Sequence, residues 1–310
     1  MKTTTLGVSS LLSTRLAYGC WRLPGTMNPS EVKPEAEAKG RRAVIAALEA
    51  GYNLFDNADI YCCGHAERIF GEALRQVPGM REKIIIATKC GICFPGGSEA
   101  TDQRHYDFSA AHIVRSCEES LQRMQVETVD LYQLHRPDFL ADPEEVAAAF
   151  SQLRQSGKAR YFGVSNFRPS LITALQSACP MPLIVHQVEI SLAKLDCFTD
   201  GTLDQCLIEK MTPLAWTPLA NVFKGDGGKT SSPDRANGVL SVLNSIARAR
   251  GVSSSVVALA WLLKHPSKIV PIIGSTNPER IRDAVKADDV ELTREEWYQL
   301  LVAARGEPVP

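Results

Sequence analysis

Short runs of apolar residues alternate along this chain with longer segments in which apolar positions recur every three or four residues. The short runs have the length of strands buried on both faces, and the longer segments have the period of amphipathic helices. Strands are therefore predicted at 16–20, 54–56, 84–89, 129–135, 161–165, 183–189, 213–218 and 269–274.

A helix is predicted after each of these strands, and several helices have recognisable ends. Gly51 and Gly157 suit helix stops, Ser109 suits an N-cap, and Pro169 occupies a favoured first helical position. The predicted helices span 35–50, 66–74, 109–121, 144–155, a segment opening at 169, 203–209, 240–250 with 256–265, and 279–287. Eight strand–helix pairs with no break in composition favour the α/β class, as a single-domain (β/α)8 TIM barrel over residues 1–310.

The alternative fold is a doubly wound parallel sheet. That fold usually has a glycine-rich fingerprint after its first strand, and Gly19–Gly25 is not such a fingerprint. A barrel typically needs about 250 residues, so extensions are expected. We assign the surplus to the N-terminal stretch, a polar loop at Asn221–Asn237 and a final helix around Arg294–Ala304.

Composition narrows the classes of function. With 45% hydrophobic residues, 22% charged residues and a formal net charge of −1, the chain gives no electrostatic case for nucleic acid or an anionic membrane as partner. No apolar run approaches the length of a membrane span, and residues 1–7 lack the apolar stretch of a secretory signal. The nine cysteines are an odd number, so we predict reduced thiols and a cytoplasmic location.

Polar and aromatic residues stand where the predicted strands end. In a (β/α)8 barrel, the chemistry lies at the C-terminal ends of the strands. These ends carry Cys20, Trp21, Asp56, Lys89, His135, Ser165, Asn166, Gln187, Trp216, Gly274, Ser275 and Thr276. Lys89 and His135 each end an apolar strand, where a polar group is costly unless it is paired. Either residue alone would suit a structural role, and the gathering of the set at one end favours chemistry.

A carboxylate, a phenol, an ammonium and an imidazole form the reactive set, namely Asp56, Tyr61, Lys89 and His135. An ammonium stabilises a neighbouring phenolate, so we expect Lys89 to lower the pKa of Tyr61 from about 10. Asp56 would orient Lys89 and keep it charged, which makes Tyr61 a general acid near neutral pH. His135 would donate a hydrogen bond to a substrate oxygen. The alternative is a core strand with Tyr61 as a packing aromatic.

Four cysteines lie close to Tyr61 and Lys89 in the sequence: Cys62, Cys63, Cys90 and Cys93. A zinc or redox site is one interpretation. Two of the four are adjacent and half a zinc signature is weak, so we favour apolar packing and expect no metal.

Five motifs resemble those of the aldo-keto reductase superfamily, and they occur in the family order. They are Phe55–Tyr61, Thr88–Lys89, Leu134–Asp138, Gly163–Phe167 and Pro271–Ser275. Within the family, the likeness is greatest to compact bacterial, YdhF-like oxidoreductases, through the segment that contains Asp138 and the Pro-Val-Pro tail. The resemblance implies a TIM barrel that binds NADP(H), with Asp56, Tyr61, Lys89 and His135 as catalytic tetrad.

The resemblance also implies a set of cofactor contacts. Ser165, Asn166 and Gln187 would hold the nicotinamide carboxamide, and Trp216 would stack on the nicotinamide ring, with core packing as its alternative role. The remaining implied contacts are Cys20, Trp21, Pro218, Leu219, Gly274, Ser275, Thr276 and Arg280.

The segment from Gly274 to Arg280 resembles the part of the family that binds the adenosine phosphate. Asn277 can cap a helix whose first residue is Pro278, which would leave free N–H groups and a positive dipole end for phosphate. Arg280 suits a 2′-phosphate, so NADP is favoured over NAD.

The implied activity is that of an NADP-dependent aldo-keto reductase of the alcohol dehydrogenase or carbonyl reductase type. It would reduce aldehydes and ketones to alcohols by hydride transfer, with Tyr61 as general acid. The expected partner is a small carbonyl substrate, and the expected state is a monomer or weak homodimer. The alternative hypothesis is a catalytically weak NADP(H)-sensing regulatory or binding subunit with the same fold.

Overall fold

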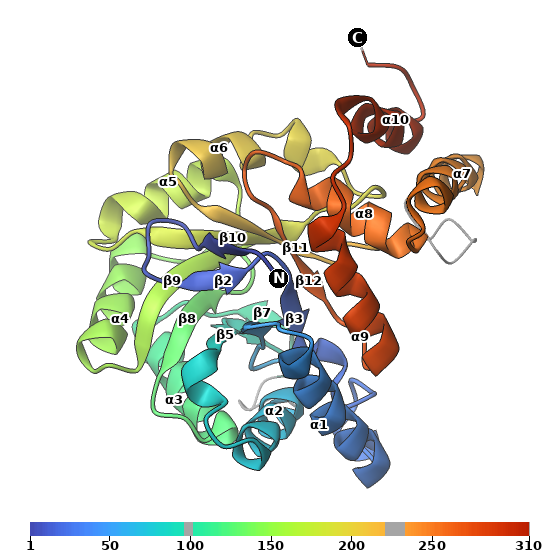
Figure 1. The fold of residues 1–310 in the computed structure, drawn as a ribbon. Helices are drawn as coiled ribbons and strands as arrows, with labels where there is room; N and C mark the ends of the chain where they lie inside the picture. Colours follow the sequence, from blue (N-terminus) through green and yellow to red (C-terminus); the bar gives the residue numbers. More distant parts are fainter. Residues whose placement is uncertain (96–101, 221–232, 310) are drawn as a thin grey trace.

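The computed structural model describes residues 1–95, 102–220 and 233–309. Eight parallel strands form a closed barrel in the order β10-β11-β12-β3-β4-β5-β8-β9, and helices surround it (Figure 1). The prediction of a (β/α)8 TIM barrel is confirmed.

The eight strands agree closely with the apolar runs. They are β3 (Ala17–Gly19), β4 (Leu54–Asp56), β5 (Ile85–Cys90), β8 (Val129–Leu134), β9 (Ala159–Ser165), β10 (Leu183–Glu189), β11 (Thr212–Trp216) and β12 (Val270–Ile273). Successive residues of a strand point to opposite faces, and both faces are buried here. In β5, Ile85 and Ala87 join the small apolar cluster inside the barrel, whereas Ile86 joins the large cluster between strands and helices.

The helices follow the strands as predicted. They are α1 (Pro34–Glu49), α2 (His65–Gln76), α3 (Ala110–Met124), α4 (Pro143–Gln155), α5 (Pro169–Ala178), α6 (Thr202–Ile208), α7 (Pro233–Arg250), α8 (Ser254–Leu263), α9 (Pro278–Val285) and α10 (Arg294–Arg305). Ser109 caps α3 by accepting a hydrogen bond from the N–H of His112. Pro169 is the first residue of α5.

Two antiparallel hairpins were not predicted. The first joins β1 (Thr3–Thr5) to β2 (Leu12–Thr14), and its apolar residues Leu6 and Leu11 belong to the cluster inside the barrel. It therefore closes the end of the barrel opposite the C-terminal ends of the strands. The second joins β6 (Ile92–Cys93) to β7 (His105–Tyr106), between β5 and α3.

The predicted loop at Asn221–Asn237 was partly wrong. Helix α7 begins at Pro233, so residues 233–237 are helical, and residues 221–232 lie outside the described part of the chain. Helix α7 contacts α10, and Arg250 forms an ion pair with Glu296 at 2.5 Å.

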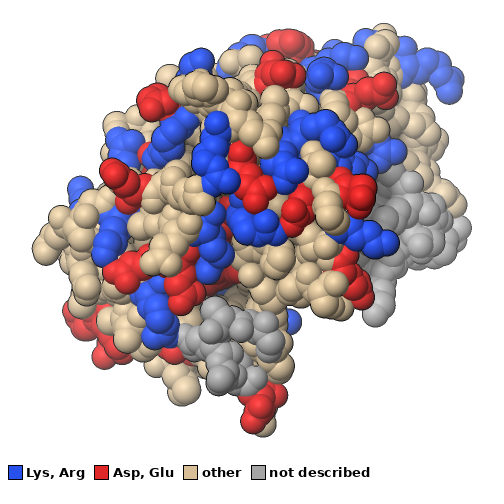
Figure 2. All heavy atoms as spheres, turned by 90° about the horizontal axis from the view of Figure 1, so that it is seen from below, with Lys and Arg blue, Asp and Glu red and all other residues tan. Residues whose placement is uncertain are grey.

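Acidic and basic side chains are interspersed over the face seen in Figure 2, which agrees with the near-zero net charge. Within the described ranges, no single helix is long and apolar enough to cross a membrane. Residues 235–250 and 254–263 satisfy that criterion only as a pair, and the chain bends by 96° between them.

Candidate active site

Lys89 lies at the centre of the polar groups that the strand ends bring together. Its side chain is fully buried at the end of β5. The ammonium donates to Asp56 Oδ2 at 2.8 Å, to the carbonyl oxygen of Asn57 at 2.6 Å and to the Tyr61 hydroxyl at 3.0 Å. All three donors of the ammonium are thus used. Three of the four residues predicted to be reactive therefore meet in one constellation.

Asp56 is held from two sides of the barrel. Its Oδ2 accepts from Lys89, and its Oδ1 accepts from Nε2 of Gln187 on β10 at 2.8 Å. A buried carboxylate is stable only when it is paired in this way. Asp56 therefore fixes the position of the Lys89 ammonium and links it to the opposite strand.

Tyr61 lies on the loop between β4 and α2, which turns through three successive residues with positive φ. The φ angles are 50° for Cys62, 51° for Cys63 and 82° for Gly64. Helix α2 begins at the next residue, and Tyr61, which lies just before the turn, accepts a hydrogen bond from Lys89.

The pKa of Tyr61 differs from the expectation. Burial raises the pKa of Tyr61 to about 12, although Lys89 acts to lower it. The cost of removing a phenolate from water exceeds the stabilisation that the Lys89 ammonium gives to it. The negative charge of Asp56 disfavours the phenolate as well. Burial also acts to lower the pKa of Lys89, but Asp56 and Tyr61 outweigh it, so that pKa is raised and the ammonium stays charged.

His135 follows directly after β8, and its ring stands edge-on to that of Tyr61, with centroids 5.9 Å apart and planes at 79°. Burial, with the charges of Lys89 and Arg136, holds the pKa of His135 well below its usual range. The imidazole is therefore neutral at physiological pH and carries one N–H donor. Within the described residues, its Nδ1 has no hydrogen-bond partner.

A second hydrogen-bonded group joins the ends of β9, β10 and β11. Asn166, at φ 62°, donates from Nδ2 to Ser165 Oγ at 2.7 Å and to the carbonyl oxygen of His135 at 3.3 Å. Ser165 Oγ donates to the carbonyl oxygen of Gln187 at 2.9 Å, and Nε1 of Trp216 donates to Asn166 Oδ1 at 3.0 Å. The amide and indole predicted as cofactor contacts are therefore fixed to each other before any ligand arrives.

The start of α9 corrects one expectation. Asn277 caps the helix and Pro278 is its first residue, as predicted, but Asn277 Oδ1 accepts from the N–H groups of both Glu279 and Arg280. These N–H groups are therefore occupied by the cap and are not free for phosphate.

An open cavity of about 540 Å³ lies beside this helix start. It is lined by Lys39, Arg42, Thr276, Asn277, Pro278, Glu279 and Arg282. Lys39 and Arg42 come from α1, and only the packing of α1 against α9 reveals their proximity to this segment. Arg280 is exposed and lines the neighbouring cavity of about 410 Å³. The basic groups suit an anionic phosphate better than a neutral ligand.

The other residues predicted as cofactor contacts differ in how far they are exposed. Cys20 is completely buried, whereas Trp21 beside it is 47% exposed. Pro218 is buried, Leu219 is half-buried, and Gly274 has room for a side chain, since an added Cβ would meet nothing within 4 Å. All nine cysteines are free thiols, and the described residues contain no group of three or more acidic, histidine or cysteine side chains that could hold a metal.

Comparison with known proteins agrees with this geometry. A model of the aldo/keto reductase family matches residues 15–302. The 6-dehydroglucose reductase of Novosphingobium aromaticivorans is 41% identical, over 98% of this chain and 96% of that protein. The oxidoreductase YdhF of Escherichia coli is 40% identical, over 85% of this chain and 86% of its own. The glycerol dehydrogenase of Gluconobacter oxydans has the same fold, with a TM-score of 0.86 and 26% sequence identity. The match covers 100% of this chain and 98% of that protein.

Proposed function

The chain belongs to the aldo/keto reductase family, as its motifs indicated, and on that basis we propose that it is an NADPH-dependent reductase of aldehydes and ketones. The observation that carries the proposal is the Lys89 ammonium, which binds both the Tyr61 hydroxyl and the Asp56 carboxylate in a buried site. Such a set serves proton transfer to a reacting oxygen.

The residues fit NADP(H) as cofactor, and the bound cofactor supplies the hydride. The hydroxyl and amide groups of Ser165, Asn166 and Gln187 are suited to the nicotinamide carboxamide, and the half-buried indole of Trp216 to the nicotinamide ring. At the other end, Arg280 and the basic cavity of Lys39 and Arg42 are suited to the phosphate that distinguishes NADP from NAD.

Tyr61 holds the proton that the product alcohol requires. In the protein alone its pKa is about 12, so the hydroxyl is protonated at physiological pH. Negative charge that develops on the substrate oxygen draws this proton, while Lys89 stabilises the phenolate left behind. Neutral His135 donates a hydrogen bond to the same oxygen and orients the carbonyl group.

The substrate class we propose is a small polar carbonyl compound, in particular an aldehyde derived from a sugar. A relative at 41% identity is named for the reduction of 6-dehydroglucose, and the charged side chain of Arg136 follows His135 in the same loop. We further propose that the protein acts in the cytoplasm, as a monomer or weak homodimer. The intact constellation around Lys89 favours this function over a cofactor-sensing subunit.

The test is to mix the pure protein with NADPH and either 6-dehydroglucose or 4-nitrobenzaldehyde, and to follow the absorbance of the reduced nicotinamide. We expect oxidation by the natural protein and none by Tyr61→Phe, which keeps the ring but lacks the proton. NADPH affinity should be nearly equal in the two proteins. Equal turnover by Tyr61→Phe would refute the proposed acid, and lack of turnover with every carbonyl tried would refute the reductase.

A further inference from the structure

His135 lacks the usual device that orients a functional histidine. The second ring nitrogen of such a residue commonly donates to a carboxylate or carbonyl, which fixes the ring. Here Nδ1 of His135 is enclosed and has no hydrogen-bond partner within the described residues. The position of the ring must therefore come from the backbone that carries it and from packing.

That backbone segment, residues 135–138, is fastened at both ends. At its start, the N–H of His135 donates to the carbonyl oxygen of Cys90 on β5 at 2.9 Å. At its end, Asp138 Oδ2 accepts from the N–H of Phe108 at 3.0 Å, and Oδ1 accepts from the N–H of Leu140 at 2.9 Å. Pro137 restricts the backbone between the two anchors.

Phe108 provides a fixed point for this anchor. Its side chain is 2% exposed, and its ring is stacked on Phe167, with centroids 6.2 Å apart and planes at 17°. Gly91 lies directly against the ring, since a Cβ at Gly91 would come within 2.0 Å of it. The neighbouring N–H of Asp107 donates to the carbonyl oxygen of Gly91 at 3.2 Å. Phe108 thus packs against the loops after β5 and β9 and is bonded to the loop after β8.

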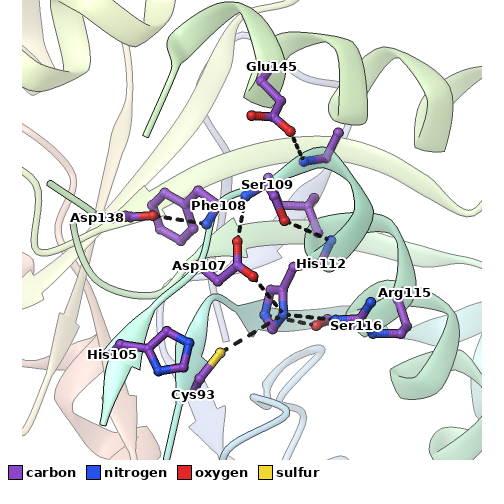
Figure 3. A network of polar contacts seen from close by, with 12 residues as sticks. Cys93, His105, Asp107, Phe108, Ser109, His112, Arg115, Ser116, Asp138 and Glu145 are labelled. Carbon is purple, nitrogen blue, oxygen red and sulfur yellow. Dashed lines mark hydrogen bonds and ion pairs between the residues drawn. The ribbon is translucent and has the colours of Figure 1, made fainter. Parts of the chain in front are cut away.

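Figure 3 shows this arrangement, with the Asp138 carboxylate reaching the Phe108 N–H at the start of α3. A second carboxylate, that of Glu145 on α4, binds the same helix start, because its Oε1 accepts from the N–H of Ala110 at 2.9 Å. Glu145 lies outside the segment that carries His135, which makes it a matched control for Asp138.

We infer that Asp138 is a positioning residue for His135, and that its bond to Phe108 sets where the imidazole meets the substrate oxygen. The inference rests on the proposed reductase function for its role in turnover, but the placement of the ring does not depend on it. A displacement of the reacting groups by about 1 Å can cost on the order of 100-fold in rate. Loss of the anchor should therefore lower kcat and leave the affinity for NADPH unchanged.

The kinetic test compares Asp138→Asn, Asp138→Ala and Glu145→Ala. Asparagine retains one acceptor oxygen and alanine retains none, so kcat should fall in Asp138→Asn and fall further in Asp138→Ala. The loss for Asp138→Ala should be about tenfold or more. Glu145→Ala should keep kcat within about twofold of the natural protein, since it leaves the His135 segment anchored. The dissociation constant for NADPH should stay unchanged in all three variants. Unchanged kcat in Asp138→Ala would overturn the inference.

A double-mutant cycle separates positioning from general structural damage. In a His135→Ala background, Asp138→Ala should cost less than about twofold in kcat, because the group that it positions is already gone. An equal loss in both backgrounds would overturn the inference and assign Asp138 a structural role.

A second readout is independent of turnover. The Cε1–Hε1 signal of His135 in a carbon–proton NMR spectrum is identified by its disappearance in His135→Ala. We expect Asp138→Ala to move this signal and Glu145→Ala to leave it in place. A signal unmoved by Asp138→Ala would overturn the inference, even if no carbonyl compound were reduced and the proposed function had failed.

Discussion

The Lys89 ammonium lies 2.8 Å from Asp56 Oδ2, and the two side chains are only 0% and 4% exposed. The two side chains form a buried ion pair, in which each group takes the place of water around the other. The remaining oxygen of Asp56 is held by Gln187 and the remaining donors of Lys89 by Asn57 and Tyr61, so no member can change without leaving another group buried and unpaired.

Lys89→Met should therefore cost both stability and turnover. Loss of one partner from a buried ion pair typically costs about 3–5 kcal/mol. Urea denaturation should show a loss of that size, and steady-state assays should show no turnover. Lys158 pairs with Glu118 on the surface, so Lys158→Met should cost about 1 kcal/mol or less. Similar losses for the two variants would contradict this account.

The buried carboxyl group of Asp59 should make the stability of the fold depend on pH. Its N–H donates to the carbonyl oxygen of Lys89 at 3.1 Å, and its Oδ1 has no partner among the described residues. Burial, which is the largest cause, and the negative charge of Glu67 together raise the pKa of Asp59 to about 8, although the charges of Arg123 and Lys89 act to lower it. In the unfolded chain the pKa is about 3.9.

Between these two pKa values, the folded state binds one proton more than the unfolded state, so the contribution of Asp59 to stability falls as pH rises through about 8. Asp59→Asn cannot lose a proton and should remove this fall. Urea denaturation at pH 5, 7 and 9 should show a stability curve that declines less in the variant than in the natural protein. Parallel curves would mean that Asp59 is ionised throughout.

Arg280 should decide between the two dinucleotides. It is exposed at the first turn of α9 and lines a cavity with Arg282 and Lys286. Loss of a charged contact to phosphate costs about 1.5–3 kcal/mol. Calorimetric titration of Arg280→Gln should show NADPH bound about tenfold or more weakly and NADH bound nearly as before. If the affinities for NADPH and NADH fell equally, Arg280 would instead bind a group that the two dinucleotides have in common.

Gly79 and Gly91 both have a left-handed backbone, but only Gly91 has a side chain packed against it. Alanine at each position therefore distinguishes the cost of backbone strain from the cost of a steric clash. Gly79 has φ 74° and open space around its Cα, whereas Gly91 has φ 99° and the ring of Phe108 against it. Gly79→Ala should cost about 1 kcal/mol from the backbone alone. Gly91→Ala should cost a further 1–3 kcal/mol or so because the ring must move. Thermal unfolding measures both, and equal values would show that Phe108 can give way.

The sequence predicted the barrel and its reactive constellation because both depend on order along the chain. Every strand of the barrel overlaps a run of mostly apolar residues, and Asp56, Lys89 and His135 stand where such runs end. The raised pKa of Tyr61 could not be predicted in this way, since burial raises it and the charge of Lys89 lowers it, and the larger effect depends on how deeply the folded protein buries the phenol.

The contacts between loops could not be predicted from the sequence either. Phe108 meets Asp138 and Phe167 only because three loops converge at one end of the barrel, and no spacing in the sequence reports that convergence. The hairpin at the start of the chain has strands of three residues rich in threonine and serine, which lack the apolar run that marked the other strands.

That hairpin has a practical consequence for laboratory work. Gly7 lies so close to Ile184 that a Cβ at Gly7 would come within 2.5 Å of the Ile184 carbonyl oxygen, and Lys2 Nζ donates to the carbonyl oxygen of Asp288 at 3.0 Å. A purification tag or fusion partner joined to Met1 would lie next to this segment, in which Lys2 is hydrogen-bonded and Gly7 is closely packed. At the other terminus, Val309 is exposed and the chain leads away from the barrel (Figure 1), so an affinity handle belongs there.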